Sequence, residues 1–177
     1  IEVRLHRDDD EFLPVLVRGT ISRDATGEAT HFAGSILDLT ERKLHEAHIH
    51  RLAFYDPLTD LPNRRLLIDR LQHSLRARTR TGQSTALLML DLDNFKTVND
   101  SLGHPVGDQL LKSIGSTLLA LVGTKGMVAR LGGDEFAIIL HPADEAELEA
   151  MADRLIAALE RPHIIGQSEI MCSGSIG

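Results

Sequence analysis

Hydrophobic and polar residues are arranged differently in the first 40 residues and in the rest of the chain. Two segments rich in β-branched and apolar residues, 11–19 and 30–39, flank a polar stretch with turn residues at 23–28. This pattern is typical of strands joined as a hairpin. Two or three strands alone bury too little surface to be stable, so we expect the chain to begin inside a domain.

A polar helix is predicted next, over residues 41–52, with Thr40 as its N-cap. Its few apolar positions are Leu44, Ala47, Ile49 and Leu52. A thin apolar stripe of this kind fits two interpretations, a solvated linker between domains or a small coiled-coil contact between two copies. The pattern does not choose between them.

Helices and strands follow one another after residue 54. We expect a helix over 61–78, with Pro62 in its first turn. A strand is predicted over 86–92, where a nearly continuous apolar run indicates burial on both faces. A loop separates that strand from a helix over 105–122, in which apolar residues recur at helical spacing.

The last third of the chain continues the alternation. Strands are predicted over 128–131 and 136–140, joined as a hairpin by the Gly-Gly-Asp-Glu sequence at 132–135. An amphipathic helix over 143–160 and a strand over 173–177 complete the pattern. Helices that alternate with strands predict a mixed α/β (α+β) fold in which helices pack on a sheet.

Charge and cysteine content narrow the classes of function. A formal net charge of −7 argues against nucleic acid as the main partner, because counterion release requires clustered Lys and Arg. The single cysteine, Cys172, cannot form an internal disulfide, which fits a reducing compartment. No apolar run is long enough to cross a bilayer. We therefore expect a cytoplasmic location without membrane contact, although a longer parent protein could be membrane-tethered.

Acidic residues occur at two points where strands end. Asp91 and Asp93 lie two apart at the end of the strand predicted over 86–92, so their side chains point to the same face. Two carboxylates there are costly unless a divalent cation, a lysine or a helix N-terminus compensates them. Asp134 and Glu135 follow two glycines, which allow a backbone to approach a bulky ligand closely.

These carboxylates converge on one site if the hairpin lies beside the strand of Asp91. Such a site suits metal-assisted phosphoryl or nucleotidyl transfer, because metals neutralise phosphates and lower the pKa of the attacking hydroxyl. Spacing alone leaves a second interpretation open. The Gly-Gly-Asp-Glu turn would then be a solvated hairpin, and Asp91 and Asp93 would cap a strand end.

The segment 94–108 offers amide, carboxylate and imidazole groups ahead of a helix. Asn99 and Asp108 could read a purine edge, with the carboxylate accepting from guanine N–H donors. Lys96 lies where it could reach a phosphate bound near the end of the Asp91 strand. Asn and Asp are also common in turns and helix caps, so this segment alone decides nothing.

Together these features resemble the GGDEF family, whose active members join two GTP molecules into cyclic di-GMP. The likeness rests on four ordered blocks and runs from about Phe54 to the end of the chain. The blocks are DPLTDLPNR at 56–64, DLDNFK at 91–96, NDSLGH with GD within 99–108, and RLGGDEF at 130–136.

The resemblance implies a sheet like the palm of nucleotide cyclases and polymerases, and a reaction that releases two pyrophosphates. Carried across by motif, Asp91, the Leu92 backbone carbonyl, Asp134 and Glu135 would hold Mg²⁺ (or Mn²⁺). Asp134 would also accept the proton of the ribose 3′-hydroxyl. Lys96 would stabilise phosphate charge in the transition state.

The same resemblance implies how the substrate is held. Asn99 and Asp108 would read guanine, with His104 beside the substrate. Each domain would hold one GTP, so catalysis would require a homodimer in which each 3′-oxygen attacks the α-phosphate of the other GTP. The rate enhancement would come mostly from positioning and electrostatics.

The first residues have a weaker likeness, to the end of a PAS sensor domain that runs into its signalling helix. It rests on RLHR at 4–7, the paired strands and DLTERK at 38–43. The expected organisation is the C-terminal part of a PAS domain over 1–40, a signalling helix over 41–54, and a GGDEF domain over 55–177 that is truncated at its C-terminus.

The sequence departs from the family pattern before the Gly-Gly turn. Many active cyclases have an inhibitory Arg-x-x-Asp site there, but residues 123–126 are Gly-Thr-Lys-Gly, so no inhibitory site is expected. The chain also ends before the family's last helical segment, which brings basic residues to the phosphates. Activity of this fragment alone therefore does not follow from the resemblance.

Three functions stay open at this point. The first is a diguanylate cyclase controlled by the PAS sensor. The second is a GTP-binding domain that modulates an attached EAL phosphodiesterase, since the sequence of the block at 91–104 is common in proteins where such a domain follows. The third is a dimerisation unit driven by the PAS sensor. The intact Gly-Gly-Asp-Glu-Phe sequence favours the enzyme, because a binding module has no need of Asp134.

Overall fold

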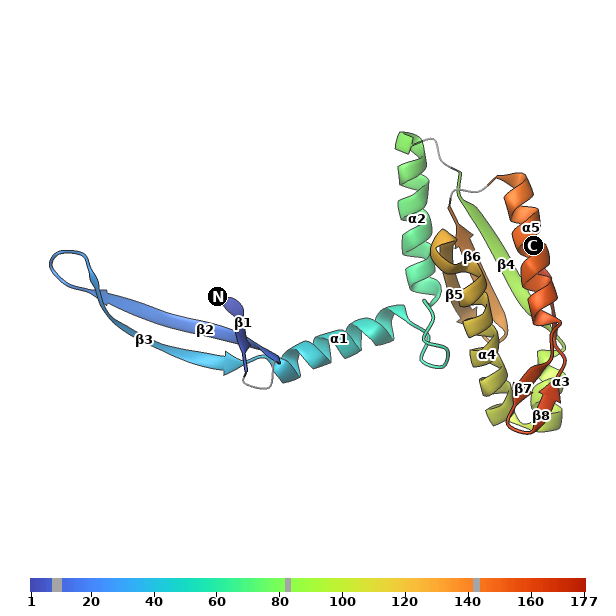
Figure 1. Cartoon of the computed structure of the whole chain (residues 1–177), viewed down its shortest axis with the longest axis horizontal. Helices are drawn as coiled ribbons and strands as arrows, with labels where there is room; N and C mark the ends of the chain where they lie inside the picture. The colour runs from blue at the N-terminus through green and yellow to red at the C-terminus, as the bar shows by residue number, and fades with distance from the viewer. Residues whose placement is uncertain (8–10, 82–83, 142–143) are drawn as a thin grey trace. The chain divides into compact units, whose positions relative to one another are not determined.

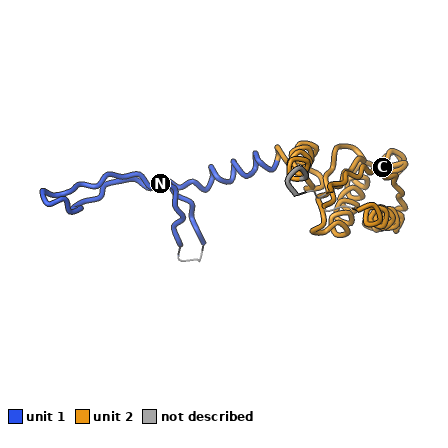
Figure 2. The backbone as a smooth tube through the Cα atoms, turned by 90° about the horizontal axis from the view of Figure 1, so that it is seen from above, with its two compact units in different colours: residues 1–51 blue, residues 52–177 orange. Residues whose placement is uncertain are grey.

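The structure is a computed structural model that describes residues 1–7, 11–81, 84–141 and 144–177, with the backbone alone at 78–81. The chain divides into two compact units, residues 1–51 and 52–177 (Figure 2). None of the described helices combines the length and the apolar composition that crossing a bilayer requires.

The first unit is an antiparallel three-stranded sheet followed by the start of a helix (Figure 1). Its elements are β1 (Glu2–His6), β2 (Phe12–Arg23), β3 (Ala29–Asp38) and α1 (Thr40–Phe54). The predicted hairpin is confirmed, because β2 pairs with β3 in antiparallel register.

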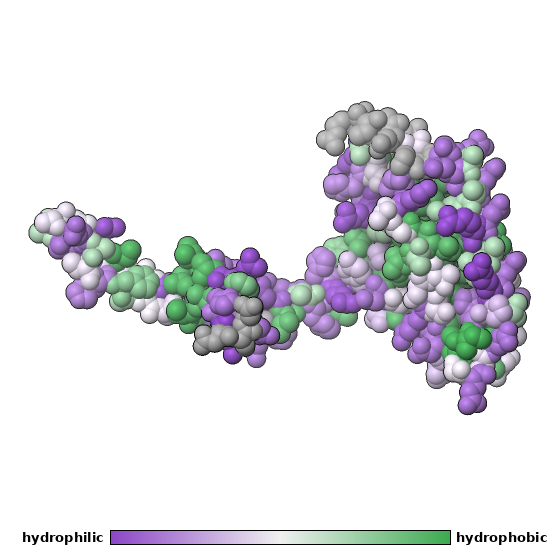
Figure 3. Space-filling model, viewed as in Figure 1, coloured by the Kyte–Doolittle hydropathy of each residue, from purple (hydrophilic) through white to green (hydrophobic). Residues whose placement is uncertain are grey.

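This small sheet has little core of its own. Among its described residues only Val15 and Leu39 are buried. Large apolar side chains such as Phe12 and Phe32 are about 60% exposed (60% and 62%), and Figure 3 shows hydrophobic surface over the strands. The sheet thus agrees with the expectation that so few strands cannot bury enough surface to be stable alone.

Two helices start differently from the prediction. Thr40 is the first residue of α1 rather than its N-cap, and its amide N–H donates to the Asp38 carboxylate at 2.7 Å. Pro62 lies before α2 (Arg64–Thr81) instead of in its first turn. The Asn63 side-chain oxygen accepts two backbone N–H groups of that turn, at 3.0 and 3.1 Å, and so caps the helix.

The second unit is built on a four-stranded antiparallel sheet in the order β5-β6-β4-β9. These strands are β4 (Ala86–Asp93), β5 (Gly126–Gly132), β6 (Glu135–Leu140) and β9 (Ser173–Ile176). The hairpin predicted around the Gly-Gly turn is confirmed as β5 and β6. A separate small hairpin, β7 (His163–Ile165) and β8 (Ser168–Ile170), was not predicted.

Helices cover both faces of this sheet (Figure 1). The first face packs against α4 (His104–Val122) and α5 (Glu145–Leu159), and the second packs against α2. Side chains of β6 alternate between two buried clusters: Phe136, Ile138 and Leu140 belong to the first face, and Ala137 and Ile139 to the second. The mixed α/β fold expected from the sequence is therefore confirmed.

Three details of the second unit correct the sequence prediction. Strand β4 is not buried on both faces, because α2 packs on β5 and β6, and Leu87 and Met89 remain 39% and 42% exposed. Residues expected to form a loop contain a short helix, α3 (Phe95–Leu102). Helix α5 begins after Asp144, which accepts the Glu147 amide at 2.8 Å; the predicted start at 143 lies outside the described residues.

Candidate metal and nucleotide site

The sheet register brings the two acidic parts of the sequence together. Asp91 of β4 lies directly opposite Glu135 of β6, and Asp134 precedes Glu135 in the turn. Desolvation raises the pKa of Asp91, and the negative charges of Asp134, Glu135 and Asp93 raise it further. Like charges have this effect at close range. The carboxylates of Asp91 and of the turn therefore share one site at the end of the strands.

Asp93 is held differently from Asp91. Hydroxyl groups of Ser173 and Ser175 on β9 donate to its two carboxylate oxygens, at 2.9 and 3.2 Å. No group among the described residues donates a hydrogen bond to the Asp91 carboxylate, which is exposed. Of the two strand carboxylates, Asp91 is thus the one left for a ligand.

The donor set fits a divalent ion that is shared with a phosphate. In the described part of the chain, no three His, Cys, Asp or Glu side chains are grouped around one point as ligands of a closed metal site. Mg²⁺ does not require such a cage, since it usually binds one or two carboxylates together with substrate phosphates and water. Carboxylates that repel one another and are at least partly exposed, as those of Asp91 and Asp134 are, offer that kind of open site.

Arg130 fixes the position of the Gly-Gly turn. Its guanidinium donates twice to the Gly133 carbonyl, at 2.7 and 3.1 Å, and once to the Asp56 carboxylate, at 2.9 Å. Gly133 has a φ of 55°, in the left-handed region that favours glycine, and a Cβ there would meet nothing within 4 Å. The turn is therefore held by Arg130 through the Gly133 carbonyl, and the space beside the Gly133 Cα is open.

Asp56, the acceptor of the third Arg130 hydrogen bond, lies in the loop before α2. Asp56 accepts the amide and the hydroxyl of Thr59, at 2.8 and 2.7 Å. Burial acts to raise the pKa of Asp56, but the hydrogen bonds from Thr59 and the charge of Arg130 outweigh it and lower the pKa. The side chains of Arg130 and Asp56 are only 10% and 15% exposed. Sequence reasoning gave neither residue a role, because nothing in one sequence pairs positions 74 apart.

The residues predicted to read guanine lie on two neighbouring helices. Asn99 is in α3, and His104 and Asp108 are one turn apart in α4, both exposed. Neither Asn99 nor Asp108 is a turn or cap residue, so that alternative is wrong for both. The helices approach closely at Gly107, where a Cβ would clash with the Asn99 side-chain oxygen.

Three further residues named from the sequence lie near the Asp91 end of β4. Lys96 is exposed in the first turn of α3, three residues after the last residue of β4. Leu92 is buried, at 1% exposure, so its side chain does not face a ligand. The Glu135 carboxylate lies 3.6 Å from the Arg64 guanidinium, and both side chains are at least half exposed.

Comparison with known proteins shows which family this arrangement of sheet, turn and helices belongs to. The sequence model of the family described as "Diguanylate cyclase, GGDEF domain" matches residues 53–177. The chain belongs to the GGDEF family. The sheet with its acidic turn and flanking helices is thus a GGDEF domain.

Relatives of this GGDEF domain occur in larger proteins. The chain is 43% identical over 142 residues to the signaling protein YkoW of Bacillus subtilis, covering 79% of the chain and 18% of YkoW. It is 40% identical over 127 residues to the bifunctional diguanylate cyclase/cyclic di-GMP phosphodiesterase MucR of Pseudomonas aeruginosa, covering 72% and 18%. The chain spans roughly a fifth of the length of the curated relatives it matches.

A solved structure shares the fold. The coiled coil and GGDEF domain of DgcB from Caulobacter crescentus, in complex with c-di-GMP, matches with a TM-score of 0.72 and 25% sequence identity. The match covers 78% of this chain and 75% of that one. The fold expected from the resemblance is therefore confirmed.

Contact between Gly107 and Asn99 gives a prediction for the GGDEF domain. Gly107→Ala is expected to displace the Asn99 amide and weaken binding of a non-hydrolysable GTP analogue with Mg²⁺ about tenfold, the cost of one hydrogen bond. Calorimetric titration measures the affinity. Gly115→Ala, in the same helix, is the control, because its Cβ would lie nearest to Leu61 and Phe136, neither of which is assigned to guanine recognition. Unchanged affinity in Gly107→Ala would remove Asn99 from guanine recognition.

Repulsion around Asp91 gives a prediction about stability. Because folding raises the pKa of Asp91, ionised Asp91 destabilises the fold, and stability falls as pH rises through that pKa. Without divalent ions, Asp91→Asn is expected to stabilise the domain at pH 7 by at most about 0.5 kcal/mol, since the site is exposed and screened. The gain should vanish in acid.

Thermal unfolding at both pH values measures this difference. Asp93→Asn is the comparison, and it should destabilise the domain because it weakens the bonds from Ser173 and Ser175. A lower melting temperature for Asp91→Asn than for the wild type at pH 7 would contradict a destabilising effect of the ionised Asp91 carboxylate.

Proposed function

We propose that this chain carries a diguanylate cyclase that condenses two GTP into cyclic di-GMP and two pyrophosphates. One observation carries the proposal: in a GGDEF domain, Asp91 lies opposite Glu135, and its pKa is raised by desolvation and by the charges of the Gly-Gly-Asp-Glu turn. Carboxylates in that position are suited to a divalent ion that also binds triphosphate.

In the proposed mechanism, Asp91, the Leu92 carbonyl, Asp134 and Glu135 would hold Mg²⁺ or Mn²⁺. The ion, when bound, neutralises phosphate charge and lowers the pKa of the ribose 3′-hydroxyl. Asp134 accepts the 3′-hydroxyl proton as the bond from the 3′-oxygen to the α-phosphorus forms. The bond from the α-phosphorus to the bridging oxygen breaks, pyrophosphate leaves, and Lys96 stabilises the phosphate charge that develops.

Substrate recognition is assigned to the α3–α4 pair. Asn99 and Asp108 read guanine, and His104 lies beside the substrate. Their placement on adjoining helices, with Asn99 packed against Gly107, supports a single recognition surface. Each domain binds one GTP, so two copies face one another and the homodimer is the catalytic unit.

The first unit is proposed to regulate this activity. The proposed location of both units is the cytoplasm. In this proposal residues 1–40 belong to a PAS sensor, 41–54 form its signalling helix, and 55–177 form the GGDEF domain. A three-stranded antiparallel sheet with exposed apolar faces, followed by a helix, agrees with that organisation.

A regulatory role is the alternative, in which the GGDEF domain binds GTP and modulates an attached EAL phosphodiesterase. The similarity to MucR, which is named a bifunctional diguanylate cyclase/cyclic di-GMP phosphodiesterase, supports this alternative. Incubating the protein that contains this chain with GTP and Mg²⁺, followed by mass spectrometry, separates the two. We expect cyclic di-GMP and pyrophosphate, both abolished by EDTA. GTP binding without product, together with a changed phosphodiesterase rate, would overturn the cyclase proposal in favour of the alternative.

A further inference from the structure

Three histidines lie close together on the surface of helix α1. They are His45, His48 and His50, and the whole chain has only nine histidines. Every residue from 41 to 52 of this helix is exposed. Imidazole nitrogen is a preferred ligand of zinc and of other divalent transition ions. The positions of the three rings around the helix therefore decide whether any of them can bind one ion together.

One side of α1 is occupied by ion pairs. Arg42 and Lys43 contact the Glu2 carboxylate of β1, at 3.1 and 3.2 Å. The same two side chains contact Glu46, one turn further along the helix, at 3.0 and 3.7 Å. His50 follows Glu46 by four residues, so it projects from this occupied side as well.

His45 and His48 project from the other side of α1. They are three residues apart, which places their side chains next to each other on consecutive turns. In the part of the chain that the structure describes, neither ring takes part in a hydrogen bond or an ion pair. Both rings are thus available to a single ion.

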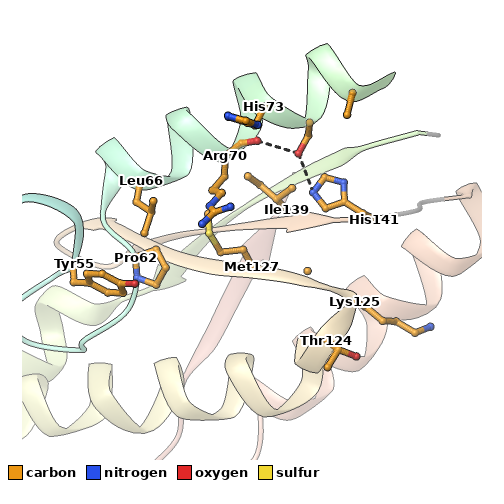
Figure 4. Close-up of a pocket in the computed structure, with 13 residues that line it drawn as sticks. Tyr55, Pro62, Leu66, Arg70, His73, Thr124, Lys125, Met127, Ile139 and His141 are labelled. Atoms are coloured by element: carbon orange, nitrogen blue, oxygen red, sulfur yellow. Dashed lines mark hydrogen bonds between the residues drawn. The ribbon is translucent and has the colours of Figure 1, made fainter. Parts of the chain in front are cut away.

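The two histidines of the second unit that are not exposed show a different arrangement. The ring nitrogens of His141 lie 3.1 and 3.0 Å from the hydroxyl groups of Ser74 and Thr85, and Figure 4 shows the first of these contacts in a pocket wall. Both ring nitrogens of His163 also have hydrogen-bond partners. Neither ring can bind an ion without giving up hydrogen bonds, whereas the pair on α1 can.

A single chain does not complete a zinc site around this pair. Structural zinc takes four ligands in a tetrahedral arrangement. Within the described ranges, no group of three or more His, Cys, Asp or Glu side chains could hold a metal ion, so His45 and His48 supply only two ligands. A second copy of the chain supplies the other two when the same sides of two α1 helices meet. Two-fold pairing brings the same patch of both copies together in this way.

The residues around the pair support contact between two helices. Leu44 and Leu52 lie one turn before and one turn after His48, and they are 63% and 59% exposed. Apolar residues at this spacing form the seam between two paired helices, and a polar residue inside the seam reduces stability. An ion bound to His48 offsets that cost. Contact between two copies therefore accounts for the leucines and the histidines together, which a solvated linker does not.

We propose that two copies of the chain bind one Zn²⁺ between their α1 helices, with His45 and His48 of each copy as the four ligands. The ligand is of the class that prefers imidazole nitrogen, in contrast to the hard ion assigned to the carboxylates. Zinc would stabilise the pairing of chains that the proposed cyclase requires. The zinc site itself does not rest on the proposed function, because it involves neither GTP nor the carboxylates.

Calorimetric titration of the 177-residue chain with ZnCl₂ in excess Mg²⁺ tests the ligands, since Mg²⁺ competes for oxygen ligands but poorly for imidazole. We expect one zinc ion per two chains. His45→Ala and His48→Ala should each weaken binding by more than about tenfold, because each removes two of the four ligands. The matched control is His50→Ala, at an exposed position on the ion-paired side of the same helix. It should alter the affinity less than about twofold.

Sedimentation equilibrium tests the part played by the second copy. Zinc should lower the dissociation constant of the wild-type dimer by more than about tenfold, because an ion that binds only the dimer stabilises it. In His48→Ala the dissociation constant should be the same with and without zinc. Neither measurement uses GTP, so failure of the zinc site and failure of the proposed cyclase are distinguishable.

Four outcomes would overturn the proposal. Absence of zinc binding would exclude the site, and one zinc ion per chain with an unchanged dimer dissociation constant would exclude the shared ligands. Equal weakening by His50→Ala and His48→Ala would contradict the assigned side of the helix. Loss of zinc binding in His104→Ala would place the ion on α4 instead of α1.

Discussion

Asp134→Asn is expected to lower the rate of cyclic di-GMP formation by about 10²–10⁴-fold, while GTP still binds. Asparagine keeps the shape of the side chain but cannot accept the 3′-hydroxyl proton and brings no negative charge to the ion. The turn should keep its conformation, because it is anchored by Arg130 through the Gly133 carbonyl rather than through Asp134. The initial rate of product formation and the affinity for a GTP analogue are the two measurements.

The control is Asp153→Asn, which makes the same chemical change at an exposed residue of α5 outside the site. Its rate should equal that of the wild type. Loss of product with retained GTP binding in Asp134→Asn supports the role of proton acceptor, whereas unchanged turnover would exclude it.

Arg130→Ala is expected to lower the free energy of unfolding by about 2 kcal/mol and the rate of product formation more than tenfold. Removing one partner of a fully buried ion pair costs about 3–5 kcal/mol, and the slight exposure of Arg130 and Asp56 reduces that figure. The variant also frees the Gly133 carbonyl from two hydrogen bonds, so Asp134 loses its fixed position. Urea unfolding monitored by circular dichroism measures the stability.

The pH dependence separates this ion pair from general damage. The lowered pKa of Asp56 means that its contribution is present above the usual value of 3.8 and is lost as pH falls through the lower folded pKa. The stability difference between the wild type and Arg130→Ala should therefore shrink in acid. Arg161→Ala, at an exposed position, should change neither stability nor rate. A stability loss in Arg130→Ala that stays the same below pH 4 would contradict the role of the pair.

Local patterns were sufficient for most of the second unit's fold. The apolar spacing of α4 and the Gly-Gly turn between β5 and β6 are strong signals, and both elements formed as predicted. The apolar run of β4 is ambiguous, because a strand's sequence does not say whether a helix covers its second face. Helix α3 was missed because it is only eight residues long and begins directly after the strand.

The site was only partly predictable. The sequence identifies candidate residues, but the register of the strands determines which of them are adjacent. Asp91 and Asp134 could be placed together once the hairpin was assumed to lie beside β4, and the pairing of Asp91 with Glu135 confirms that assumption. The bonds of Asp93 to β9 and of Arg130 to Asp56 join segments 74 or more residues apart. No periodicity or turn signal within one sequence encodes such contacts.

A crystal structure of the domain with Mn²⁺ and a non-hydrolysable GTP analogue tests the central claim most directly. Anomalous diffraction would locate the ion without relying on its ligands. We expect Mn²⁺ in contact with the Asp91 and Asp134 carboxylates, at about 2.1 Å as for a small hard cation, and with an oxygen of the triphosphate. Triphosphate bound elsewhere, or an ion that touches neither carboxylate, would contradict the account.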